Sequence, residues 1–264
     1  MAVASTRRAI VRHPAHAQPI IAPDDIAVEQ PLVLAMAGAA IATLMRTPGH
    51  DIELAAGWLV VESGVRRAED IVTLRGCRED DTDRVHITLD GGIRAPRPRA
   101  FVTSAACGVC SADVVDLNPL VTSAPHRPSW RVRRETLAAV PQAMRARQRA
   151  FDRTGGVHAA ALADEGGRLR VVREDVGRHN AVDKVIGWAL LSGSLPVTDH
   201  LLVVSGRVSF EIVQKAVAAG AAGIVAVSAP TSLAVDLSRE YGLLLVGMAR
   251  GDHLNVYSGA DLVC

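Results

Sequence analysis

The pattern of hydrophobic and polar positions is clearest in the second half of the chain, from Thr154 onward. Two alternating segments, VHAAALAD and RLRVVRED, flank the turn residues Glu165-Gly166-Gly167 and predict a β-hairpin. Three continuous apolar runs, LLVVSG, GIVAVS and LLLVGMA, predict strands that are buried on both faces. Helices are predicted before and between these strands, over AVDKVIGWALLSG, SFEIVQKAVAAG (with Ser209 as N-cap) and SLAVDLSREYG. This order predicts a parallel α/β sheet with short connections.

The apolar runs of the first half are shorter and more mixed. VEQPLVLAMAGAAIATLM predicts two strands around Gly38, and IVTLRGC and RVHITLD predict two more. RTPGHDIELAAGWLVVESG predicts a helix, because Pro48 stands near its start and Gly64 just past its end. This half therefore predicts a smaller domain of mixed α+β structure.

A stretch rich in Pro, Ser and Thr, residues 118–129, separates the two halves, and residues 135–151 predict a helix after it. We expect residues 1–24 to form a flexible N-terminal arm. Residues 25–125 then form the mixed α+β domain, which ends in the region of a CxxC motif, and residues 126–264 form the α/β domain.

Composition narrows the classes of function. Of the 264 residues 49% are hydrophobic and only 3% aromatic, and the net charge is +1. Bulk attraction to nucleic acid or to an anionic membrane is therefore not expected, nor is a base-stacking surface. No segment approaches the ~20 apolar residues of a membrane span, and the N-terminal arginines precede no apolar stretch typical of a secretory signal. Four cysteines without such a signal indicate a reducing compartment, so we expect a cytoplasmic protein.

The segment SAACGVCSA carries two thiols, Cys107 and Cys110, among small residues. A structural zinc site normally uses four ligands, and the other two cysteines, Cys77 and Cys264, are isolated in sequence. The histidines of the chain leave a composite site open, and such a zinc-stabilised binding module would contain stoichiometric zinc. A single CxxC motif is therefore only a weak indication of zinc.

Two enzyme classes that use CxxC can be compared with this sequence. Cytidine deaminases carry H-x-E and P-C-x-x-C, but here Ala160 stands two places after His158, and Ala106 precedes Cys107. Without the glutamate that moves protons, deaminase chemistry is excluded. A thioredoxin-like dithiol would lie within a βαβ pattern, whereas the βαβ pattern of this chain lies far downstream of the motif. FVTSAACGVC fits the expected strand and small residues in part, so a dithiol oxidoreductase stays an open alternative.

Sulfur transfer and simple packing are the remaining interpretations of the two thiols. A CxxC context can lower a thiol pKa below the ~8.5 of free cysteine, and the thiolate can then take the outer sulfur of a persulfide. Small neighbours leave the sulfur accessible for this reaction. The alternative is that both cysteines fill a core as small apolar residues.

Six segments of the chain, in one order, resemble the FdhD family, the formate dehydrogenase accessory sulfurtransferases. The resemblance covers most of the chain outside the N-terminal arm and the REDDTDR segment. The segments are ATLMRTPGHDIELAAGWL (42–59), TSAACGVCS (103–111), TGGVHAAAL (154–162), REDVGRHNAVDKVIG (173–187), VVSGRVSFEIVQKA (203–216) and SAPTSLAVDLSREYGLLLVGMARGDHLNVYSG (228–259).

The resemblance implies a sulfurtransferase. In such a protein Cys107 carries a persulfide accepted from a cysteine desulfurase, and Cys110 is an accessory thiol. The sulfur passes to the molybdenum (or tungsten) bis-pterin guanine dinucleotide cofactor, a client rather than a permanent cofactor, before that cofactor enters formate dehydrogenase. The resemblance also implies a homodimer and a cytidine-deaminase-like α/β domain. The alternative is a non-catalytic chaperone that binds the same cofactor and whose thiols are structural.

The cofactor-binding stretch of the family maps onto Met248, Ala249, Arg250, Gly251, Asp252 and His253. Ligands of open α/β sheets bind outside the carboxyl ends of the strands, where this stretch and the loops 174–180 and 206–209 are predicted. Both loops lead into helices, whose N-terminal N–H groups attract anions. Arg178 and Arg207 add charge there, although each alone is typical of a solvated loop. We therefore expect both arginines to join in binding the cofactor.

Overall fold

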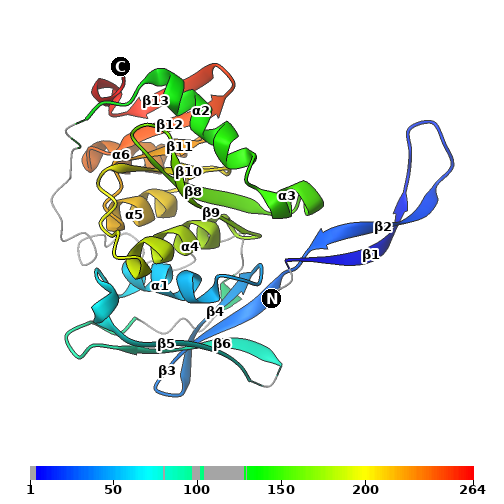
Figure 1. Cartoon of the computed structure of the whole chain (residues 1–264), viewed down its shortest axis with the longest axis horizontal. Helices are drawn as coiled ribbons and strands as arrows, with labels where there is room; N and C mark the ends of the chain where they lie inside the picture. Colours follow the sequence, from blue (N-terminus) through cyan, green and yellow to red (C-terminus); the bar gives the residue numbers. More distant parts are fainter. Residues whose placement is uncertain (1–3, 80, 97–101, 104–127, 129) are drawn as a thin grey trace.

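Two larger β-sheets with helices between them and outside them, and a separate two-stranded N-terminal hairpin, make up the computed structural model of this protein (Figure 1). The structure describes residues 4–79, 81–96, 102–103, 128 and 130–264. The CxxC segment, with Cys107 and Cys110, lies outside the described residues. Within the described part of the chain, no helix is both long enough and apolar enough to cross a membrane.

The second half of the chain forms a six-stranded sheet in the order β13-β12-β11-β10-β8-β9. The parallel pairing of β10, β11 and β12 is confirmed, but β8, β9 and β13 pair antiparallel with their neighbours. The predicted β8–β9 hairpin is thus confirmed, and the sheet predicted as parallel is mixed, because tight turns rather than helices connect β8 to β9 and β12 to β13. The likeness to the cytidine deaminase fold stays a prediction. The strands are β8 (His158–Asp164), β9 (Leu169–Asp175), β10 (His200–Val204), β11 (Gly223–Ala226), β12 (Leu244–Arg250) and β13 (His253–Ser258).

Helices cover both faces of this sheet (Figure 1). α4 (Arg178–Leu191), α5 (Phe210–Ala218) and α6 (Ser232–Glu240) share one buried apolar cluster with the sheet. α2 (Arg134–Arg145) packs on the opposite face, where its apolar side chains form a second cluster with the strands. The continuous apolar strands are thus buried on both faces, as their sequences predict.

The single helix predicted over residues 135–151 is in fact two helices. The chain leaves helical geometry at Gln148, whose ψ is 75°, and α3 (Arg149–Thr154) begins there. Glu174 of β9 stabilises this start, because its carboxylate accepts hydrogen bonds from the backbone N–H groups of Ala150 (2.9 Å) and Phe151 (2.8 Å). The break thus depends on a residue far along the chain.

The first half forms a five-stranded mixed sheet in the order β5-β6-β3-β4-β7. The four predicted strands and the predicted helix α1 (Asp51–Glu62) are confirmed. α1 lies between this sheet and α4 (Figure 1). One cluster of buried side chains runs from β3 through both helices to β10. The division into domains stays a prediction. The strands are β3 (Gln30–Met36), β4 (Ala39–Arg46), β5 (Ile71–Glu79), β6 (Thr82–Leu89) and β7 (Val102–Thr103).

α1 and α4 approach each other through two glycines. A Cβ atom added to Gly57 would lie 1.9 Å from the carbonyl oxygen of Asp183, and one added to Gly187 would lie 1.8 Å from that of Glu53. The two backbones are therefore closer than any larger residue permits at either position. This contact fixes the first half of the chain against the second.

The N-terminal segment is a β-hairpin of β1 (Ser5–Arg12) and β2 (Ile20–Ala27), where a flexible arm over residues 1–24 was expected. Its sequence carries Pro14, Pro19 and Pro23, which argue against a strand in a sheet interior but are compatible with an isolated two-stranded ribbon. The hairpin projects from the molecule beside α3 (Figure 1). Short 3₁₀ turns at Ala68–Asp70 and Ala260–Leu262 complete the described elements.

Candidate functional site

A cavity of about 660 Å³ lies at the carboxyl ends of the parallel strands β10, β11 and β12. Residues at or just past these ends line it, namely Ser205, Val227 and Arg250. α2 and the turn after α3 form the opposite wall, which includes Gln142 and Gly156. The volume falls within the ~300–1,000 Å³ of small-molecule sites, and the place is the sheet edge at which the sequence predicts ligand binding.

The three arginines predicted at this edge differ in their contacts. Arg250 lines the cavity, and its Nε donates a hydrogen bond of 3.0 Å to the carbonyl oxygen of Val227. Arg178, the first residue of α4, has a buried Nε atom for which the described residues offer no hydrogen-bond partner. Arg207 is exposed, and neither it nor Arg178 is among the described residues that line the cavity. An arginine with an unused donor close to a cavity is typical of an anion site.

His158, at the start of β8, lines the cavity, and its pKa is shifted by burial and by the charges around it. Burial lowers its pKa most, and the charges of Arg178, His179 and Arg207 lower it further, while Asp175 acts in the opposite direction. The imidazole is therefore neutral near pH 7. The same positive potential that disfavours its protonation favours a bound anion.

The stretch from Met248 to His253 is the end of β12 and its turn into β13. Ala249, Arg250 and Gly251 line the cavity. The other three predicted residues, Met248, Asp252 and His253, are not among the described residues that line it. The structure thus brings half of the predicted stretch to the cavity.

The backbone of this stretch is bent. Met248 has a left-handed φ of 54° and Gly251 one of 56°, and the register between β12 and β13 shifts between Gly247 and Arg250. A left-handed methionine is strained, and such strain persists only where its surroundings enforce it. Arg134 of α2 supports the turn by donating a hydrogen bond to the carbonyl oxygen of Asp252.

His179 and Glu211 connect the starts of α4 and α5 beside the cavity. His179 Nε2 lies 2.7 Å from a carboxylate oxygen of Glu211 and 3.4 Å from the hydroxyl of Ser209, the N-cap residue of α5. Burial alone would raise the pKa of Glu211, but the hydrogen bond with His179 lowers it. His179 is therefore already engaged by a carboxylate and positions the two helix starts relative to each other.

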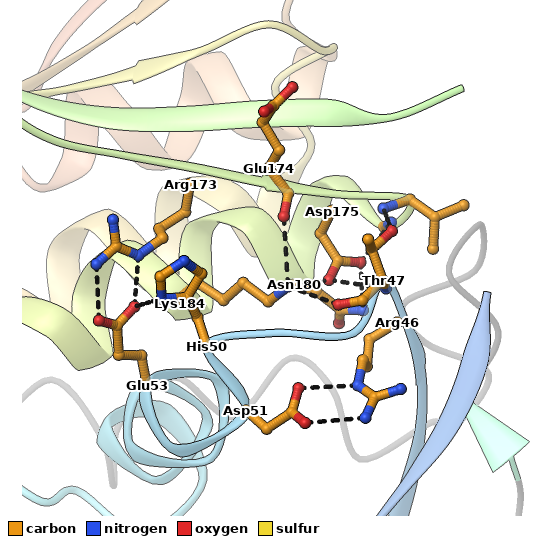
Figure 2. A network of polar contacts seen from close by, with 12 residues as sticks. Arg46, Thr47, His50, Asp51, Glu53, Arg173, Glu174, Asp175, Asn180 and Lys184 are labelled. Carbon is orange, nitrogen blue, oxygen red and sulfur yellow. Dashed lines mark hydrogen bonds and ion pairs between the residues drawn. The ribbon is translucent and has the colours of Figure 1, made fainter. Parts of the chain in front are cut away.

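A buried polar network behind the cavity joins β9 and α4 to the connection between β4 and α1 (Figure 2). Lys184 Nζ lies 2.7 Å from Asp175 Oδ2 and donates a 2.9 Å hydrogen bond to the carbonyl oxygen of Thr47. Asp175 also accepts hydrogen bonds from the Thr47 N–H (3.1 Å) and the Asn180 amide (3.0 Å). Both charged groups are almost completely buried, and each is paired and hydrogen-bonded as burial requires. The network fixes the loop 174–180 next to the cavity.

Two further ion pairs flank this network (Figure 2). Arg173 of β9 contacts Glu53 of α1 through two hydrogen bonds of 2.5 and 2.7 Å. Burial opposes ionisation of Glu53, but hydrogen bonds and charges from Arg173 and, to a lesser extent, His50 outweigh it and lower the Glu53 pKa to about 2. Arg46 is completely buried, makes two 2.9 Å hydrogen bonds to Asp51 and lies 2.6 Å from Asp83. These pairs attach α1 to both sheets.

Cys107 and Cys110, the predicted catalytic residues, lie outside the described residues. The last described residue before them is Thr103, at the end of β7, which pairs in parallel with β4. β4 continues through Arg46 to Thr47, which belongs to the network behind the cavity.

Sequence reasoning missed the wall that α2 and α3 contribute and the role of the only two lysines, Lys184 and Lys215. Lys215 lies 2.6 Å from Asp183, so both lysines form buried ion pairs. A lysine inside an otherwise apolar helical pattern, twice in an arginine-rich chain, is the signal that could have indicated them.

Comparison with known proteins identifies the family of this chain. The sequence profile of the FdhD/NarQ family matches residues 27–264. The chain belongs to the FdhD/NarQ family. This FdhD/NarQ protein is 45% identical to the sulfur carrier protein FdhD of Mycolicibacterium paratuberculosis, over 100% of both chains. It is 48% identical to that of Nocardia farcinica, over 90% of this chain and 87% of the relative. The resemblance drawn from the six sequence segments is confirmed.

A solved structure shows the same fold. The crystal structure of a candidate formate dehydrogenase accessory protein from Desulfotalea psychrophila matches this FdhD/NarQ protein with a TM-score of 0.79, over 99% of this chain and 100% of the other. The two sequences are 23% identical, so this comparison shows the fold alone.

Proposed function

We propose that this chain is a sulfur carrier, a sulfurtransferase that serves formate dehydrogenase. The proposal rests on relatives of 38–48% identity over at least 87% of both chains that carry the name sulfur carrier protein FdhD. A cysteine desulfurase supplies the sulfur, and Cys107 accepts it as a persulfide. The sulfur then passes to a molybdenum (or tungsten) bis-pterin guanine dinucleotide cofactor before that cofactor enters formate dehydrogenase. The carrier acts in the cytoplasm as a homodimer.

The cavity is the proposed binding site for this client cofactor. Its volume of about 660 Å³ suits a nucleotide-sized part of the molecule rather than the whole of it. Phosphates need positive charge and free donors. Arg250 supplies them, as does Arg178, whose Nε has no partner among the described residues, and Arg207 lies nearby. Ala249 and Gly251 leave the backbone approachable, while Met248, Asp252 and His253 shape the turn that presents them.

The sulfur chemistry needs both thiols of the CxxC segment. The Cys107 thiolate attacks the outer sulfur of the desulfurase persulfide, and the thiolate of the desulfurase leaves. Cys110 then attacks the inner sulfur of the Cys107 persulfide, so that a Cys107–Cys110 disulfide forms and hydrosulfide leaves toward the metal. A dithiol reductant restores the two thiols for the next cycle.

The decisive test is the intact mass of the protein after incubation with a cysteine desulfurase and cysteine. We expect one added sulfur atom that a reductant removes, and no addition to the Cys107→Ala variant. Cys264→Ala is the matched control, because it removes an exposed thiol outside the motif and should leave the addition unchanged. No added sulfur on the unmodified protein would contradict the proposal.

The alternative is a chaperone that binds the cofactor and docks on formate dehydrogenase without carrying sulfur. The same cavity serves both functions, so cofactor binding does not separate them. A chaperone tolerates Cys107→Ala in a formate dehydrogenase activation assay, whereas a sulfur carrier loses activity. Cys110→Ala then tests the disulfide step, since normal turnover of that variant would exclude it.

A further inference from the structure

Three side chains with metal-binding chemistry meet on the five-stranded sheet, away from the cavity. Cys77 and Glu79 lie two residues apart on β5, and His86 lies on the neighbouring strand β6. Cys77 pairs with Arg84 and Arg75 pairs with His86, so Cys77 and His86 are diagonal neighbours on one face of the sheet.

This face points away from α1. Val85 and Ile87, on either side of His86 in β6, are buried in the cluster that includes α1. Side chains alternate along a strand, so His86 lies on the opposite, outer face. Gly76 faces the α1 residue Ile52, which likewise places Cys77 outside. The trio is therefore reachable from solvent: Cys77 and His86 are half-buried, and Glu79 is exposed.

The three donor atoms are already close together. The Cys77 Sγ donates to Glu79 Oε1 at 3.3 Å, His86 Nε2 lies 2.8 Å from the same oxygen, and all three atoms lie within 4.8 Å of one another. A tetrahedral zinc ion with bonds of about 2.0–2.3 Å holds its ligand atoms roughly 3.3–3.8 Å apart. Small side-chain rotations are therefore enough to place one ion between them.

We propose that Cys77, Glu79 and His86 bind one divalent transition-metal ion, with zinc preferred and water at the fourth position. A thiolate and an imidazole favour zinc over magnesium or calcium, which prefer oxygen ligands. The ion replaces the proton that Cys77 shares with Glu79, and that proton passes to solvent. The bound ion clamps β5 to β6 near their turn.

The surroundings of the trio set the expected strength of this site. Arg84 Nε lies 3.2 Å from Glu79 Oε2, so it orients the carboxylate and leaves Oε1 for the ion. The charges of Arg75 and Arg84 oppose a cation, and burial with the Glu79 carboxylate raises the pKa of the Cys77 thiol. Because both effects weaken binding, we expect a site of lower affinity than one formed by four thiolates.

Cobalt substitution tests the site directly. The full-length chain carrying Cys107→Ser and Cys110→Ser excludes the CxxC thiols, so thiolate-to-cobalt absorption in the near ultraviolet reports the remaining cysteines. We expect one cobalt ion per protomer with this band, displaced by zinc. Adding Cys77→Ser should abolish the band, whereas Cys264→Ser, which removes the other free thiol, should leave it unchanged.

A second pair of variants tests the imidazole. We expect His86→Ala to weaken cobalt binding at least tenfold, and the exposed His253→Ala to leave it unchanged. Absence of the thiolate band in the background protein would overturn the proposal, as would a band that persists after Cys77→Ser. These outcomes are independent of sulfur transfer to Cys107, because the mass measurement does not involve Cys77.

Discussion

The α1–α4 interface and the cavity edge lie next to each other, and both are rich in charged side chains. At the interface Lys184 and Asp175 are buried, and each has several partners at hydrogen-bond distance. Next to the cavity, Arg178 has a buried Nε without a partner among the described residues. Arg250, which lines the cavity, donates one hydrogen bond to a carbonyl oxygen. Charged side chains that are paired and hydrogen-bonded stabilise the fold, whereas charged side chains with unused hydrogen-bond donors are available to bind a ligand.

This comparison assigns different consequences to similar substitutions. A change at the interface should lower the free energy of unfolding, because it leaves a buried partner unpaired. A change at the cavity should alter ligand binding and leave stability unchanged. Four substitutions test the distinction, in order of decreasing expected effect.

Lys184→Met should have the largest effect. It leaves Asp175 buried and without its cationic partner, so we expect a loss of about 3–5 kcal/mol in the free energy of unfolding, measured with urea. Arg149→Met removes one positive charge from an exposed position and should change stability by less than about 0.5 kcal/mol. Equal effects of the two substitutions would contradict a structural role for the buried pair.

Glu53→Gln should change how stability depends on pH. The Glu53 pKa of about 2 lies below the ordinary 4.5, so the contribution of its ion pair with Arg173 is complete above pH 4.5 and is lost as pH falls toward 2. We expect the variant to be less stable by about 2–3 kcal/mol at pH 7, with the difference disappearing near pH 2. A difference that stays constant with pH would exclude this role, and the exposed Glu165→Gln is the control.

Gly187→Ala tests the backbone contact itself. Its Cβ would lie 1.8 Å from the carbonyl oxygen of Glu53, so α1 and α4 must move apart. We expect a loss of about 2 kcal/mol in the free energy of unfolding, with weaker protection of α1 amides in hydrogen exchange. Gly91→Ala is the matched control, because nothing lies within 4 Å of the added atom there. A Gly187→Ala protein as stable as the control would mean that the helices adjust freely.

Arg178→Met should leave the free energy of unfolding unchanged but weaken the binding of guanosine diphosphate, used as a probe of the cavity, about tenfold. Removal of this positive charge should also raise the pKa of His158, which NMR titration can follow. Arg168→Met, at the opposite end of the sheet, should alter neither quantity. Unchanged binding of guanosine diphosphate together with an unchanged His158 pKa would exclude a role for Arg178 in ligand binding at the cavity.

Local pattern was enough to predict most of the regular elements. The apolar runs of β10, β11 and β12 alternate with helical segments, and Pro48 and Gly64 mark the ends of α1. The hairpin of β1 and β2 escaped prediction because its prolines obscure the alternation. The break at Gln148 escaped for another reason, since Glu174, which starts α3, is distant in sequence.

The candidate site was predictable where loops follow strands and not where elements pack across space. Arg250 and Gly251 could be placed at the cavity because the carboxyl ends of parallel strands meet at one edge. The hydrogen bond between the Thr47 N–H and Asp175 joins residues 128 positions apart, and nothing about a threonine or an aspartate in the sequence indicates this pairing. Such pairs depend on the docking of α1 on α4, which periodicity does not specify.

The close contact of α1 and α4 at Gly57 and Gly187 has a consequence for the synthesis of the protein on the ribosome. Gly57 is made 130 positions before Gly187 (187 − 57), which corresponds to roughly ten seconds of synthesis. During that interval the five-stranded sheet that packs on one side of α1 has been synthesised, but α4, which covers the other side of α1, has not. The apolar surface of the nascent first half is thus exposed until α4 emerges, so a chaperone that shields nascent chains should bind it within this window.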